Sequence, residues 1–69
     1  MTGEELKEAF LRGVPVQFTV DTMPNTIMRA ESIDAIIYRR IHGKLTVSAE
    51  LRDGNGRTIY IVPSRRIKE

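Results

Sequence analysis

The chain contains no cysteine, no tryptophan and only one histidine among its 69 residues. Without cysteine there is neither a disulfide framework nor a thiolate zinc site. The single imidazole of His42 cannot form the nitrogen cluster that transition metals favour. No apolar run approaches the roughly 18 residues of a membrane-spanning helix, and the first residues do not follow the pattern of a signal peptide. We therefore expect a cytoplasmic, soluble protein without metal or cofactor.

The length predicts one domain covering residues 1–69. Below about 70–80 residues a single core seldom contributes more than about 3–5 kcal/mol of net stability. Isoleucine, valine and leucine dominate the hydrophobic 41% of the chain, which favours a compact β-rich core over disorder. So small a core predicts that a protein partner, or a second copy of the chain as a homodimer, contributes to stability.

The charges are spread unevenly, although the net charge is only +2. Residues 1–36 hold six acidic and three basic side chains, whereas residues 37–69 hold eight basic and three acidic ones. Such asymmetry hints at an anionic partner. In a fold this small, however, the two halves interleave in space, so the uneven sequence need not produce a basic face.

A short amphipathic helix is predicted over residues 3–12. Thr2 and Glu5 have the spacing of a capping box, in which each side chain accepts a hydrogen bond from the other residue's backbone amide. Gly13 suits the left-handed residue after a helix, and Pro15 cannot continue one. At about ten residues the helix would be marginal alone, so it must pack on the rest of the chain.

After Pro15 the apolar period changes to two, which predicts strands. Residues 21–31 are turn-like, and 27–31 could be either part of a long loop or a short strand. Pro63-Ser64-Arg65-Arg66 is typical of one helical turn before a final short strand. The five expected strands lie at residues 14–20, 32–41, 45–52, 57–62 and 67.

Two hairpins follow from the turn residues. For Asp53-Gly54-Asn55-Gly56 we predict a three-residue loop that opposes Leu51 to Ile59 and puts a left-handed glycine at Gly56. For the hairpin around His42-Gly43 an odd-with-odd register would turn Arg39 toward the core. We therefore expect a bulge near Arg39-Arg40, or Arg39 at an open barrel end.

This order of elements resembles SH3-like small barrels over residues 14–69. The best local matches are Asp53-Gly54-Asn55-Gly56 at the distal hairpin and Ile61-Val62-Pro63-Ser64 before the last turn. The resemblance implies a mainly β (α+β) fold: an N-terminal helix followed by a five-stranded antiparallel barrel. The whole chain also resembles small uncharacterised proteins carried on mobile elements of Gram-positive bacteria, which brings no activity and no functional residues.

Catalytic chemistry finds little support. His42 stands beside a turn glycine, where a solvated polar residue is expected, and no partner for nucleophilic catalysis can be placed. The acidic residues near the start of the helix interact favourably with the helix dipole, which gives them a structural role. Three other carboxylates could meet around residues 21–31 and bind a cation, but their spacing matches no calcium loop; these are Asp21, Glu31 and Asp34. We expect no enzyme and no catalytic, cofactor-binding or metal-binding residues.

Two functions remain. The first is a non-catalytic interaction module that binds a protein partner or itself; the aromatic groove with which SH3 domains hold proline-rich peptides is not expected without tryptophan. The second is a small nucleic-acid-binding barrel, in which tyrosines stack on bases and arginines bind phosphates. Alternatively, the arginines simply pair with acidic residues. The candidate binding surface consists of Tyr38, Arg39, Arg40, Arg52, Tyr60, Arg65 and Arg66.

Overall fold

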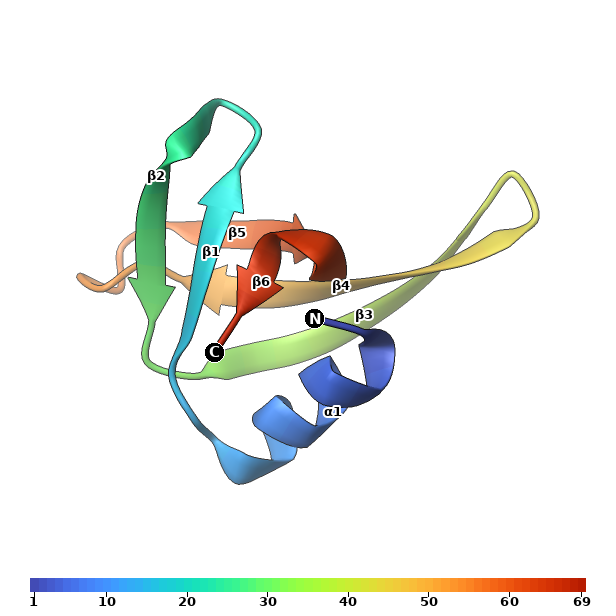
Figure 1. The fold of residues 1–69 in the computed structure, drawn as a ribbon, viewed down its shortest axis with the longest axis horizontal. Coiled ribbons are helices and arrows are strands. Elements are labelled where there is room, and N and C mark those ends of the chain that lie inside the picture. Colours follow the sequence, from blue (N-terminus) through green and yellow to red (C-terminus); the bar gives the residue numbers. More distant parts are fainter.

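The computed structural model describes residues 1–69 as one helix and two three-stranded antiparallel sheets (Figure 1). The sheets have the strand orders β2-β1-β6 and β3-β4-β5. The fold is therefore mainly β with an N-terminal helix, as predicted. Its elements are α1 (Gly3–Arg12), β1 (Val16–Val20), β2 (Met23–Ala30), β3 (Ile33–Ile41), β4 (Lys44–Arg52), β5 (Ile59–Pro63), the 3-10 turn η1 (Ser64–Arg66) and β6 (Ile67–Lys68).

The helix begins and ends where the sequence predicts. The Thr2 amide donates to Glu5 Oε1 at 2.8 Å, and the Glu5 amide donates to Thr2 Oγ1 at 3.1 Å, which completes the capping box. Gly13 follows the helix with φ 67°, a left-handed conformation that glycine adopts without strain. Leu6 and Ala9 are the buried residues of α1 and fix the helix to the core.

The capping box makes part of the stability depend on pH. The hydrogen bonds from the Thr2 amide and side chain lower the pKa of Glu5, since they favour its charged form. This contribution should be present above the ordinary glutamate pKa of about 4.3 and lost as the pH falls through the lower folded value. The difference in thermal midpoint between the protein and Glu5→Gln, which cannot titrate, should shrink between about pH 7 and about pH 2. A difference that stays constant with pH would contradict this.

The core is small and lies between the sheets and α1. Ten of 69 residues are buried, all of them apolar, and half-buried side chains including Tyr60 pack around them. The Phe18 and Tyr60 rings lie 5.6 Å apart between centroids and join the two sheets. The buried residues are Leu6, Ala9, Val16, Phe18, Ala30, Ile33, Ala49, Leu51, Val62 and Ile67.

The structure has six strands, not five, and the sheets do not close into a barrel. The additional strand is β2, which pairs with β1 from Val16 opposite Ala30 to Val20 opposite Met23. Pro24 and Asn25 made this segment resemble a loop. β2 is an edge strand, however, and an edge position tolerates a proline that lacks an amide donor.

The β3–β4 register differs from the prediction. His42 and Gly43 form a two-residue turn with φ 49° and 78°, so Ile41 lies opposite Lys44 and Tyr38 opposite Val47. Two left-handed residues are typical of the tight hairpin turn that matches strand twist. The expected bulge near Arg39-Arg40 is not found. The one irregularity in the pairing of β3 with β4 lies between Ile33 and Ala35.

The β4–β5 register is also offset by one residue, with Leu51 opposite Tyr60. The Asp53 amide donates to the Thr58 carbonyl, and the Arg57 amide donates to Asp53 Oδ1 and Asn55 Oδ1, so the loop holds one residue more than expected. Gly56 is left-handed as predicted, with φ 72°. The shift turns Tyr60 toward the core and the flanking isoleucines outward, since one step of register exchanges the two faces of a strand.

Candidate interaction surfaces

The two tyrosines of the candidate surface lie in different environments. Tyr38 is 55% exposed on β3, as a binding role requires. Tyr60 lies opposite Leu51 and is half-buried against the core beside Phe18, so its predicted placement on the face away from Leu51 was wrong. The tyrosine platform expected from the sequence is therefore reduced to a single side chain.

The arginines divide into paired and unpaired groups. Within the candidate surface, Arg52 Nε lies 2.9 Å from Asp34 Oδ2, and Arg66 Nη2 lies 2.6 Å from Asp21 Oδ1. Outside it, Arg12 and Arg29 pair with Glu69 and Glu31. Three candidate arginines have no carboxylate partner; these are Arg39, Arg40 and Arg65.

The end of the β3–β4 hairpin projects beyond the rest of the molecule (Figure 1). We call residues 38–46 the basic arm, because it carries Arg39, Arg40 and Lys44 and no acidic residue. His42 occupies the exposed tip, as expected for a turn residue. The arm is thus the one place where unpaired arginines lie beside an exposed tyrosine.

A second surface lies on the outer side of the β3-β4-β5 sheet, opposite the core. Glu50 pairs with Ala35 and Ile61, and Ser48 pairs with Ile37 and Pro63, so these side chains share that side. Ile59, Ile61 and Ile41 are 52%, 48% and 49% exposed. We call this surface the isoleucine face, formed by Ile37, Ile41, Ile59 and Ile61. The sequence did not predict this face, because the expected register placed Ile59 and Ile61 inside.

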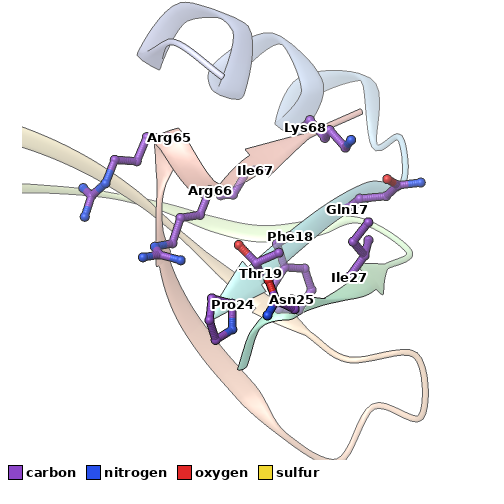
Figure 2. Close-up of a pocket in the computed structure, with 10 residues that line it drawn as sticks. All are labelled: Gln17, Phe18, Thr19, Pro24, Asn25, Ile27, Arg65, Arg66, Ile67 and Lys68. Carbon is purple, nitrogen blue, oxygen red and sulfur yellow. The ribbon is translucent and has the colours of Figure 1, made fainter. Parts of the chain in front are cut away.

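A third surface is a groove of about 410 Å³ on the β2-β1-β6 side of the molecule (Figure 2). η1 forms one wall, and the amino group of Met1 secures η1 through bonds to the carbonyls of Ser64 (2.9 Å) and Ile67 (2.8 Å). The groove contains three cations and no acidic residue. Its ten lining residues are Gln17, Phe18, Thr19, Pro24, Asn25, Ile27, Arg65, Arg66, Ile67 and Lys68.

The carboxylates considered for a cation site are separated from one another. Asp21, Glu31 and Asp34 each face a different arginine. No three histidine, cysteine, aspartate or glutamate residues are grouped so as to hold a metal ion. The single α-helix is also too short and too polar to cross a membrane.

Comparison with known proteins adds no further constraint. No protein-family model, curated protein or solved structure matches the chain.

Proposed function

We propose that the protein is a small non-catalytic interaction module that binds a second copy of itself through the isoleucine face. The observation that carries the proposal is the pair of half-exposed isoleucines Ile59 and Ile61 on edge strand β5, which share the outer side of the sheet with half-buried Ile37 of β3. Single exposed apolar residues are ordinary, whereas exposed apolar residues that share one side of a sheet indicate a candidate interface. A core of only ten buried residues would gain stability from covering it.

The charges around the isoleucine face favour a second copy as its occupant. Glu50 has no ion-pair partner and lies opposite Ile61, beyond which Arg52 and Asp34 pair with each other, whereas unpaired Arg39 and Lys44 lie toward the arm. A two-fold axis across the strands would place the basic end of each copy against the acidic end of the other. The same surface is thus complementary to itself, as a symmetric dimer requires.

The size of the face predicts a weak dimer. Neighbouring strands lie about 4.8 Å apart, and each residue adds about 3.4 Å to the length of a strand. The outer side of the three strands therefore has an area on the order of 400 Å² per copy. A stable interface buries about 800 Å² per partner. Sedimentation equilibrium should therefore show 7.9 kDa monomers at low micromolar concentration and dimers toward millimolar concentration. A monomer throughout that range would contradict the proposal.

The fold of this module is best interpreted as an opened SH3-like barrel. The β3-β4-β5 meander, the turn η1 after Pro63, and a short last strand that pairs with β1 follow the order that the resemblance implies. In this interpretation β1 is the first strand of the barrel, and β2 lies in the long first loop that follows it. The support is the order of elements alone.

The second candidate function is binding of nucleic acid by the basic arm. It is favoured by unpaired Arg40, which shares one side of the ribbon with exposed Tyr38, and by unpaired Arg39 on the other side. A two-stranded ribbon fits the major groove, and an exposed aromatic ring stacks on unpaired bases.

Salt dependence tests this candidate. Each phosphate contact contributes about 0.7–0.9 to the slope of log affinity against log salt, so Arg39→Gln/Arg40→Gln should reduce the slope by about 1.4–1.8. Fluorescence anisotropy with single-stranded and duplex oligonucleotides measures the slope. Arg57→Gln is the control for loss of a single charge, because Arg57 is exposed and unpaired on the β4–β5 loop, outside the arm. Absence of binding at low salt, or an equal effect of the control, would reject nucleic-acid binding by the arm.

A further inference from the structure

The basic arm is a two-stranded ribbon that extends beyond the rest of its sheet (Figure 1). β4 pairs with β5 only as far as Ser48, which lies opposite Pro63, so residues 44–47 pair with β3 alone. An isolated two-stranded ribbon is at best marginally stable in water. Contact with a partner would therefore stabilise the arm, and the side chains near its end indicate the chemistry of that partner.

Three large apolar side chains of the arm are exposed to water. Leu45, Tyr38 and Ile41 have exposed fractions of 64%, 55% and 49%. Leu45 lies opposite Arg40, two residues from Tyr38, so these three side chains share one side of the ribbon. Ile41 lies opposite Lys44, and these two share the other side. Apolar and basic side chains are therefore interleaved on both sides of the same projecting segment.

The cations of the arm have no carboxylate partner. Arg39, Arg40 and Lys44 form no ion pair within the chain, and residues 38–46 contain no aspartate or glutamate. Near an anionic lipid surface each basic residue strengthens binding about five-fold. The aliphatic stems of arginine and lysine also cover apolar surface while their charged ends stay among polar groups. The cations of the arm thus fit the headgroup layer of an anionic bilayer.

The exposed apolar side chains favour a lipid surface over a nucleic acid. A nucleic acid would bind the arginines and stack on Tyr38, but its charged backbone offers no apolar layer to cover Leu45 and Ile41. Segments that bind at a membrane surface combine basic residues with apolar ones, and the apolar ones enter the boundary between headgroups and acyl chains. Tyrosine is enriched at the same level. Polar His42 occupies the turn, which limits the arm to shallow insertion.

We propose that the basic arm binds the surface of an anionic lipid bilayer. Its three cations contact the headgroup phosphates, and Leu45 and Ile41 enter the boundary layer beneath them. Such binding is peripheral and needs no membrane-spanning helix. It does not depend on the isoleucine face, because Leu45 lies on the opposite side of the sheet from Glu50 and Ile61.

Co-sedimentation of the unmodified protein with vesicles tests the proposal. One set of vesicles contains phosphatidylcholine alone, and the other contains phosphatidylcholine mixed with phosphatidylglycerol. We expect about 100-fold tighter binding to the mixed vesicles, since three cations act together, and added salt should weaken it. Equal binding to both sets, or binding to neither, would overturn the proposal. Binding to an oligonucleotide without binding to vesicles would overturn it in favour of nucleic acid.

Matched variants show whether the end of the arm makes the contact. Arg40→Gln should weaken binding to the mixed vesicles about five-fold, and Leu45→Ser about ten-fold. Arg57→Gln and Ile27→Ser are the controls, because Arg57 is exposed and unpaired on the β4–β5 loop and Ile27 is 63% exposed on β2. Both controls should bind like the unmodified protein.

Circular dichroism verifies that each variant is folded. Unchanged binding by folded Leu45→Ser would overturn the insertion of apolar side chains, and equal losses in the variants and their controls would overturn the assignment to the arm. A protein that binds mixed vesicles but stays monomeric in solution would reject only the self-association.

Discussion

Replacement of Phe18 by alanine should leave most of the protein unfolded at room temperature. Phe18 is 1% exposed on the central strand β1, between Met28 of β2 and Ile67 of β6, and its ring meets Tyr60 of the other sheet. Core Phe→Ala changes cost about 3–5 kcal/mol. A single core in a chain of this size supplies about 3–5 kcal/mol in total. The substitution should therefore consume nearly all of the free energy of unfolding.

Urea unfolding followed by circular dichroism measures this effect. For Phe18→Ala we expect no cooperative transition, or a midpoint close to zero denaturant. Phe10→Ala is the matched control, since Phe10 is 37% exposed on α1 and should lose less than about 1.5 kcal/mol. Similar losses in both variants would show that the two sheets are not held together at Phe18.

A charged pair on β5 should abolish self-association without unfolding the monomer. In Ile59→Glu/Ile61→Lys the new glutamate lies opposite Arg52 and the new lysine opposite Glu50, so each gains a favourable cross-strand partner. In the dimer both charges would be buried against the isoleucines of the second copy. Isolated buried charges cost several kcal/mol, so the dissociation constant should rise at least about 100-fold.

Sedimentation equilibrium at matched concentrations measures that change, and circular dichroism verifies that the variant remains folded. Ile27→Glu is the control, since Ile27 is 63% exposed but lies on β2 of the other sheet. The control should dimerise like the unmodified protein. Undiminished dimerisation of the β5 variant would place the interface elsewhere.

The sequence predicted the features that depend on neighbouring residues. The helix follows from the spacing of Thr2 and Glu5 and from Gly13, because capping acts within one turn. The single turn Ser64–Arg66 was predicted from the local sequence Pro63-Ser64-Arg65-Arg66, without a capping side chain. Left-handed Gly56 was also predictable, because a turn glycine adopts that conformation without strain.

Strand register could not be predicted, because it depends on loop hydrogen bonds and on partners distant in sequence. The bonds from the Arg57 amide to Asp53 and Asn55 lengthen the second loop by one residue. That step moves Tyr60 into the core and exposes Ile59 and Ile61. The main candidate interface therefore depends on a one-residue change of register. The alternation of apolar and polar residues along the strand does not reveal such a change.

The candidate binding surface was predictable only in part. Tyr38, Arg39 and Arg40 are adjacent in sequence and remain together on the arm. Arg52 and Arg66 have carboxylate partners 18 and 45 positions away, and no local pattern predicts such pairs. The groove combines residues from β1, β2, η1 and β6, which only the tertiary fold brings together.

Dilution of ¹⁵N-labelled protein tests self-association most directly. Between about 1 mM and about 20 μM, concentrations that bracket a weak dimer, we expect the amide signals of residues 35–37, 48–50 and 59–61 to move along one shared binding curve. Signals from α1 and from the groove should stay constant, and the Ile59→Glu/Ile61→Lys variant should show no movement. Shifts centred on the basic arm or the groove, or no shift at any concentration, would contradict a dimer formed through the isoleucine face.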